Sequence, residues 1–138
     1  MVMLINLTAE LAKLKTLQGL TPQTAFEEGE GFASLAPYRD SAIFAIKSTG
    51  TTSWERHLDG EEFVQILEGA ATIDMVTGVG PLQSFEVSAG MIAIVPKGVW
   101  HRARFAHDTT LITVTPTRTE FVKLDVDDPR TSQSVAPG

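Results

Sequence analysis

The sequence predicts an all-β fold, a sandwich or a barrel, from two observations. From Ala42 onward, apolar and polar residues alternate with a period of two, as half-buried strands do. The alternation is divided into eight short segments: AIFAIKS, SWERHL, EFVQIL, ATIDMV, QSFEV, MIAIVP, HRARF and TLITVT. Turn-forming residues separate most of them: Asp59-Gly60, Glu68-Gly69, Gly78 to Pro81, Ala89-Gly90 and Lys97-Gly98. Eight short strands at nearly regular spacing are typical of such β domains.

The N-terminal region predicts a short helix that packs on this β domain. Its leucines are spaced three and four residues apart, as on one face of a helix, at Leu4, Leu7, Leu11, Leu14 and Leu17. Gly19 and Pro22 would end the helix. We expect the leucine stripe to cover a barrel mouth or the underside of the sheet, with a partner-binding helix as the alternative. Residues 22–41 predict irregular chain or an edge strand.

The 138 residues suffice for one compact domain with a core of its own, which we expect to span residues 1–126. Residues 127–138 are polar, contain two prolines and offer little to bury. They therefore predict a flexible C-terminal tail.

Composition narrows the class of protein. A formal net charge of -6 without any basic run argues against nucleic-acid binding. The absence of cysteine leaves only nitrogen and oxygen ligands for a metal and is compatible with the reducing cytoplasm. No apolar stretch is long enough to cross a membrane, and the N-terminus lacks the features of a signal peptide. We expect a soluble, cytoplasmic and unprocessed protein.

Two segments together predict a metal site. The first reads Glu55-x-His57-x4-Glu62-x6-Gly69, and the second reads Gly90-x5-Pro96-x-Gly98-x2-His101. Residues two apart on a strand share a face, so Glu55 and His57 can reach the same ion, while Glu62 and His101 would come from neighbouring strands. Burying these carboxylates without a cation would cost several kcal/mol. A single histidine is more often an ordinary hydrogen-bonded side chain, but four candidate ligands in one pattern favour a divalent ion.

The spacing of these two segments resembles the signature motifs of the cupin superfamily. The resemblance covers about residues 42–115 and implies a double-stranded β-helix, a jelly-roll-like barrel that holds a metal with three histidines and one glutamate. Glu55 stands where the first histidine is usual, and Phe105 stands where an asparagine is frequent. Short bacterial single-domain cupins resemble this chain further in the segments WERH, GEE and LEG. This resemblance suggests that Glu55 is a family trait, and it implies a homodimer.

The sequence leaves the role of Glu55 open between three interpretations. As a fourth metal ligand beside His57, Glu62 and His101, it would make a site with a divalent ion formally neutral. As an unbound carboxylate beside the ion, it would be a catalytic base that moves a proton on or off a substrate. As a structural residue, it would pair with Arg56, Arg102 or Arg104.

The remaining candidates would shape the site rather than react. An apolar substrate pocket is predicted from Val64, Ile66, Ile92, Ile94 and Phe105. Trp54 and Trp100 alternate away from the ligands, so we expect them outside the barrel or at the dimer interface. His107 is expected in a solvated loop rather than at the metal.

Function is predicted at the level of class. The first hypothesis is a metalloenzyme, dioxygenase-like or isomerase-like, in which Fe, Mn, Ni or Zn orients a small oxygen-bearing substrate. The two imidazoles and one carboxylate of His57, His101 and Glu62 resemble the facial triad of non-haem iron enzymes. The alternative is a binding or sensing module that uses the same pocket without turnover. The fold class alone does not decide between them.

Overall fold

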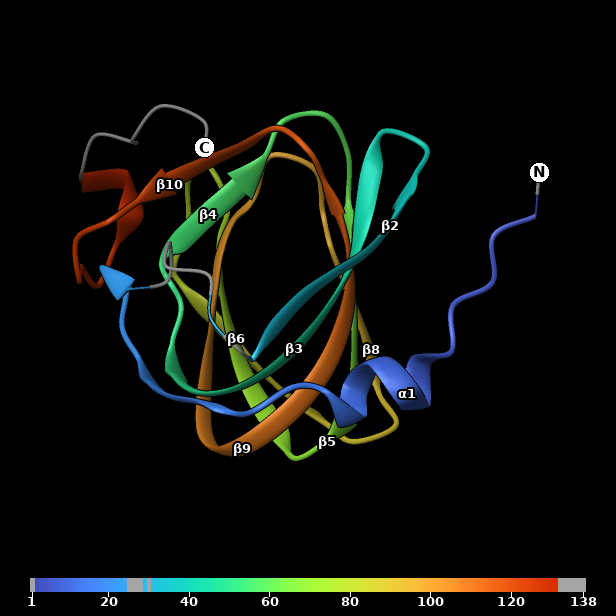
Figure 1. Ribbon diagram of the computed structural model, residues 1–138. Coiled ribbons are helices and arrows are strands. Elements are labelled where there is room, and N and C mark those ends of the chain that lie inside the picture. Colours follow the sequence, from blue (N-terminus) through green and yellow to red (C-terminus); the bar gives the residue numbers. More distant parts are fainter. Residues whose placement is uncertain (1, 25–28, 30, 132–138) are drawn as a thin grey trace.

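The computed structural model describes residues 2–24, 29 and 31–131, and it is built almost entirely of β-strands (Figure 1). In chain order the elements are α1 (Leu7–Ala12), β1 (Leu17–Leu20), β2 (Phe32–Tyr38), β3 (Ser41–Thr51), β4 (Trp54–His57), β5 (Glu62–Glu68), β6 (Ala70–Val76), β7 (Gln83–Ser88), β8 (Ile92–Val95), β9 (Trp100–Pro116), β10 (Thr119–Val122) and a short 3-10 helix (Pro129–Thr131). The prediction of an all-β fold is confirmed.

Strand β9 organises the barrel because it takes part in both halves of the sheet. Its first half pairs antiparallel with β6, where Met75 lies opposite His101. Its second half pairs antiparallel with β5, where Ile66 lies opposite Leu111. Strand β3 also runs along β9 for most of its length. The segments HRARF and TLITVT, predicted as two strands, are therefore one strand that passes from one half of the barrel to the other.

The outer strands complete each half. Strand β7 pairs with β6 and β8 pairs with β5, both antiparallel. On the other side, β2 pairs antiparallel with β3, and β10 pairs antiparallel with β4. Of the alternatives for residues 22–41, the edge strand is therefore present as β2, while residues 25–28 and 30 lie outside the described part of the chain.

Two of the turns between strands require glycine. Gly69, between β5 and β6, has a φ of 84°, and a Cβ atom built on it would lie 2.5 Å from the carbonyl oxygen of Asp108. No larger residue fits this approach without moving the neighbouring chain. Gly98 likewise has a φ of 78° and donates its N–H to the carbonyl of His57 at 2.8 Å. This turn ties the second motif to the strand that carries His57.

The predicted N-terminal helix is present but shorter and less packed than the leucine spacing suggests. The Asn6 side chain caps its start by accepting a hydrogen bond from the N–H of Ala9 at 3.0 Å, and α1 ends at Ala12 without a buried residue. Leu17 belongs to β1, which pairs parallel with β3. The stripe of leucines is therefore divided between a helix and a strand, because backbone pairing with β3 captures its last member.

Two hydrophobic clusters hold the barrel together. The inner cluster lies inside the barrel and consists of Val64, Ile66, Ala71, Ile73, Val87, Phe105 and Leu111. The outer cluster lies on the opposite face of the strands and joins Trp54, Val76, Trp100 and Val122. Both tryptophans alternate away from the ligands as predicted, but only 1% of Trp54 and 8% of Trp100 is exposed. They pack outside the barrel, as expected, but the segment around Val126 covers them, so they offer little surface to a dimer interface.

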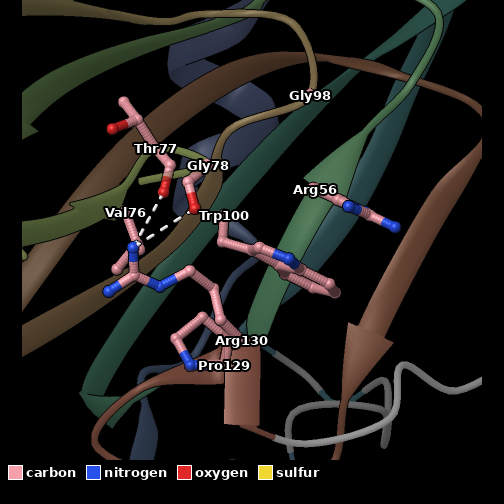
Figure 2. Close-up of a pocket in the computed structure, with 8 residues that line it drawn as sticks. All are labelled: Arg56, Val76, Thr77, Gly78, Gly98, Trp100, Pro129 and Arg130. Atoms are coloured by element: carbon pink, nitrogen blue, oxygen red, sulfur yellow. Dashed lines mark hydrogen bonds between the residues drawn. The ribbon is translucent and has the colours of Figure 1, made fainter. Parts of the chain in front are cut away.

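The C-terminal segment is anchored through Thr131, so the predicted flexible tail does not begin at Asp127. The carbonyl of Val126 accepts hydrogen bonds from the Trp54 indole at 2.8 Å and from Arg102 at 3.2 Å. Pro129 is buried, and Arg130 donates to the carbonyls of the turn after β6. Figure 2 shows the Arg130 guanidinium directed at Thr77 and Gly78 of this turn. Together with Trp100, these residues line a cavity of about 370 Å³. Residues 132–138 lie outside the described part of the chain.

No helix among the described residues has the length and apolar character needed to cross a membrane.

Candidate metal centre

The four predicted ligands come together inside the barrel. Glu55 and His57 project from β4, Glu62 from the start of β5 and His101 from the start of β9. Glu55 lies directly opposite His101 in the pairing of β4 with β9. One nitrogen or oxygen atom from each of the four residues lies within 4.8 Å of all the others, and the group is suited to hold a metal ion.

The separations match those of atoms that share one ion. Oε1 of Glu62 lies 2.9 Å from Nε2 of His101 and 3.5 Å from Nε2 of His57. Oε1 of Glu55 lies 3.4 Å from Nε2 of His101 and 3.5 Å from Nε2 of His57. Ligands bound at about 2.1 Å from one ion lie about 3–4 Å from each other. Small shifts of these side chains would therefore complete a coordination sphere.

His57 presents a buried nitrogen that has no hydrogen-bond partner. Its Nδ1 lies 2.8 Å from Oγ1 of Thr119, whose hydroxyl donates to the carbonyl of Pro116. The Thr119 oxygen thus accepts the Nδ1 proton, which directs the lone pair of neutral Nε2 toward the centre. Nε2 is buried and has no hydrogen-bond partner among the described residues. Buried polar atoms are nearly always satisfied, so this nitrogen fits a metal ligand.

His101 and Glu62 are oriented in the same way. Nδ1 of His101 lies 3.0 Å from the carbonyl of Val99, which can only accept, so this nitrogen carries a proton and Nε2 faces Glu62. Oε2 of Glu62 accepts a hydrogen bond from Thr115 at 2.6 Å, and Thr115 bonds in turn to Thr113 at 2.8 Å. Such hydrogen bonds fix metal ligands in place and tune their affinity for the ion.

Without a cation, the two histidines of the centre hold their protons more tightly than usual and the two glutamates hold theirs less tightly. Burial by itself lowers the pKa of both histidines, but the adjacent carboxylates of Glu55 and Glu62 outweigh it and raise the pKa of His57 to about 9 and of His101 to about 10. Burial raises the pKa of Glu55 and Glu62, yet the adjacent histidines outweigh it and hold the pKa of both carboxyls below its ordinary value. The site therefore favours positive charge at its centre, from protons or from a metal.

The ion pair between Glu55 and a neighbouring arginine is not formed. Arg56 pairs with Glu120 at 2.8 Å, across the register of β4 and β10. Arg102 and Arg104 both pair with Asp74, at 2.8 and 2.9 Å, on the outer face. The side chain of Glu55 is 25% exposed, against 2% for His57. Of the three interpretations, the fourth ligand and the unbound base remain.

A cavity of about 510 Å³ opens from this centre into the barrel. Val64, Ile66 and Phe105 line it, as predicted for an apolar pocket. Ile92 and Ile94 do not, since they are 54% and 52% exposed on the outer face of β8. The segment MIAIVP is apolar on both of its faces, so alternation alone left its orientation ambiguous. His107 lies on the exposed middle of β9 and outside the ligand group.

Sequence reasoning missed Thr115 and Thr119, which orient Glu62 and His57. The sequence contains a signal for them, because every second position from 109 to 119 is a threonine, except for Leu111. Polar residues repeated on the inward face of a strand indicate a polar lining rather than a dry core. Their proximity to the ligands required the pairing of β9 and β10 with their neighbours.

Comparison with known proteins places the chain in a family. Residues 42–115 match the model of the cupin domain. Among curated proteins, none matches the chain significantly. Protein NMB1881 from Neisseria meningitidis is similar in fold, with a TM-score of 0.60 and 23% identity over 83% of this chain and 99% of that one. A cupin-2 domain containing protein from Shewanella frigidimarina has a TM-score of 0.54 and 22% identity over 67% of this chain and 86% of that one.

The hydroquinone 1,2-dioxygenase from Sphingomonas sp. TTNP3, solved with 4-hydroxybenzoate bound, is also similar in fold. Its TM-score is 0.54 at 13% identity, over 67% of this chain and 68% of that one. At these identities the likeness concerns the fold, and the all-β cupin barrel predicted from the sequence is thereby confirmed. The matched segment covers more than half of the chain and contains all four residues of the candidate centre. The chain therefore belongs to the cupin family.

Proposed function

We propose that the protein is a metalloenzyme in which a divalent ion, bound by His57, Glu62 and His101, orients a small oxygen-bearing substrate in the barrel. One observation carries this proposal. Nε2 of His57 is buried and unpartnered, and it points at the carboxylate oxygens and the nitrogen with which it would share the ion. A purely structural histidine in this position would leave a polar atom unsatisfied.

The ligand set suggests the candidate ions. Imidazole nitrogen and carboxylate oxygen suit Fe, Mn, Ni and Zn, and two imidazoles with one carboxylate are the donors of non-haem iron sites. A bound ion would polarise a substrate oxygen and stabilise charge that develops on it. The fold shared with a hydroquinone 1,2-dioxygenase makes dioxygen chemistry the first activity to test, and isomerisation the second.

Glu55 supports catalysis in preference to passive binding. It is the most exposed of the four side chains and lines the cavity beside the centre. A carboxylate held there, within reach of both the ion and a bound molecule, can accept a proton from the substrate. If Glu55 instead binds the ion, the centre becomes formally neutral, which lowers its power to activate water and disfavours hydrolysis.

A binding or sensing module is the second candidate. The cavity favours it, because most of the residues that line it are apolar and could hold a ligand without turnover. Turnover of a substrate would exclude this role, whereas tight binding without chemistry would support it.

Metal analysis tests the proposal directly. We expect protein purified without added metal and then loaded with one equivalent of Fe(II), Mn(II), Ni(II) or Zn(II) to retain one ion per chain. His57→Ala and His101→Ala should lose most of it while the barrel stays folded by circular dichroism. His107→Ala is the matched control, because His107 is exposed on the same strand as His101. Full stoichiometry in both ligand variants would reject the centre, and a dioxygen-consumption screen follows if iron is retained.

We also propose that the protein is a cytoplasmic homodimer. With the tryptophans buried, the support for a dimer is an apolar row across the outer face of four strands. Ile94 lies opposite Phe63, Phe63 opposite Val114, and Val114 opposite Ile43. Ile94 is 52% exposed. Sedimentation should give a dimer that Ile94→Glu dissociates, and a monomer at all micromolar concentrations would contradict it.

A further inference from the structure

The lining of the cavity changes from polar to apolar over the same distance along three strand segments. On β5 the inward residues run from Glu62 through Val64 to Ile66, and they line the cavity. On the first half of β9 they run from His101 through Ala103 to Phe105. Each series spans four residue-to-residue steps, or roughly 13 Å of strand. Both begin at the metal centre and end on hydrocarbon.

The second half of β9 shows the same change in the reverse direction of the chain. Thr115, at the polar end, donates to Glu62, whereas Leu111 lies opposite Ile66 at the apolar end. Ile46 of β3 lies opposite Leu111 and also lines the cavity. The cavity therefore has one end rich in ligand atoms and one end that offers only hydrophobic contact.

The described lining contains no cationic side chain that could bind an anion away from the centre. Arg102 borders the cavity, but its guanidinium points outward, where it bonds Asp74 at 2.8 Å and stacks on the Trp54 ring at 4.7 Å. The other charged groups in the lining are Glu55, Glu62 and His101. Two carboxylates cancel the charge of a divalent ion, so the centre has no surplus positive charge for an anionic substrate.

We infer that the substrate is an uncharged molecule with one hydroxyl or carbonyl oxygen and an apolar, ring-sized body, and that the site rejects carboxylate anions. The oxygen lies at the centre beside Glu55, and the body extends toward Phe105 and Leu111. An anion would lose its hydration in an apolar cavity and meet two carboxylates, whereas a neutral molecule of the same shape would not. This inference rests on the proposed metal centre and adds the class of substrate to it.

Benzamide and benzoate test the inference, because they have the same shape and differ in charge. We expect the Zn(II)-loaded protein to bind benzamide at least about tenfold more tightly than benzoate by isothermal titration calorimetry at neutral pH. Oxalate, a small dianion, should bind no better than benzoate. Equal or tighter binding of benzoate, or no binding of benzamide at millimolar concentration, would overturn the inference.

Two phenylalanines supply a matched pair of variants. Phe105→Ala should weaken benzamide binding and leave zinc stoichiometry unchanged. Phe85 is 45% exposed and lies outside the lining, so Phe85→Ala should change neither benzamide binding nor zinc stoichiometry. Phe105→Leu preserves more of the core and gives the same comparison if the alanine variant does not fold. Failure of the wild type to bind zinc would count against the proposed function. Zinc binding together with a preference for benzoate would count only against the inferred substrate class.

Discussion

Thr119 holds His57 in the tautomer that a metal requires: its Oγ1 lies 2.8 Å from Nδ1 of the imidazole, on the side opposite the centre. The two residues come from paired strands, since Thr119 of β10 lies opposite His57 of β4. The ring therefore has one satisfied nitrogen and one buried nitrogen without a partner. The same strand pairing that closes the barrel edge thus prepares a metal ligand.

Replacement of Thr119 should weaken metal binding without removing a ligand. We expect Thr119→Val to lower the affinity for Zn(II) by about 10–100-fold, because His57 loses the acceptor that fixes its ring. Competition with a chromophoric chelator measures this affinity. Thr72→Val is the control, since Thr72 bonds Glu86 on another part of the sheet. If both variants bind zinc as the wild type does, the Thr119 hydroxyl has no role at the centre.

Glu55→Gln distinguishes the two remaining roles of Glu55. The substitution keeps the volume of the side chain and removes its charge and its basicity. If Glu55 is a ligand, metal affinity should fall by about tenfold or more, because a neutral amide is a weaker donor. If it is the base, the metal should stay and turnover should be lost. Parallel measurement of metal content and substrate conversion separates these results, and no change in either would leave Glu55 a structural residue.

Metal binding should release protons. In the metal-free protein the pKa of His57 is about 9 and that of His101 about 10, so both rings are charged near neutral pH and must lose a proton to bind an ion. We expect roughly two protons per Zn(II) near pH 7.5, and an affinity that rises with pH. Calorimetry in buffers of different ionisation enthalpy counts these protons.

The stability of the metal-free protein should show the same linkage. Since both histidine pKa values are raised above 6.5, their contribution is complete below that pH and is lost as the pH rises through about 9 to 10. The thermal unfolding temperature of the metal-free protein should therefore fall as the pH rises over this range. The unfolding temperature of the metal-loaded protein should change less. In the calorimetric measurement of proton release, an enthalpy of zinc binding that does not depend on the buffer would show that the histidines are already neutral.

The sequence predicted the parts of the site that depend on strand alternation. Glu55 and His57 share a face because they are two residues apart on one strand, and this relation survives any error in the strand boundaries. Ile92 and Ile94 were misplaced for the opposite reason. Their neighbours Ala93 and Val95 are also apolar, so the pattern does not say which face is inside, and only the pairing of β8 with β5 decides it.

Burial on the outer face could not be predicted locally. Trp54 and Trp100 are covered by residues around Val126, which follow them by more than twenty positions and have no periodic pattern. The polar composition after Asp127 indicated a loose tail, yet Arg130 is fixed by three carbonyls of the turn after β6. Contacts of this kind depend on the folded arrangement of the barrel rather than on local propensity.

The Asp74 network should contribute to stability independently of the metal. Asp74 is 1% exposed and accepts hydrogen bonds from Arg102, Arg104 and Ser84. Burial raises the pKa of its carboxyl, but these donors outweigh that effect and hold the pKa below 3.8. Asp74→Asn should therefore lower the free energy of unfolding by about 2–3 kcal/mol near neutral pH, because it leaves two arginines without their counter-charge.

The effect of Asp74→Asn on stability should depend on pH. With a lowered pKa, the contribution of Asp74 is present above about pH 4 and disappears as the pH falls through the native value, so the gap between wild type and Asp74→Asn should narrow in acid. Asp59→Asn is the control, because Asp59 forms an exposed pair with Arg118 that is worth at most about 1 kcal/mol. Urea unfolding at several pH values measures both variants. Equal effects of the two substitutions would show that burial gives the Asp74 network no special strength.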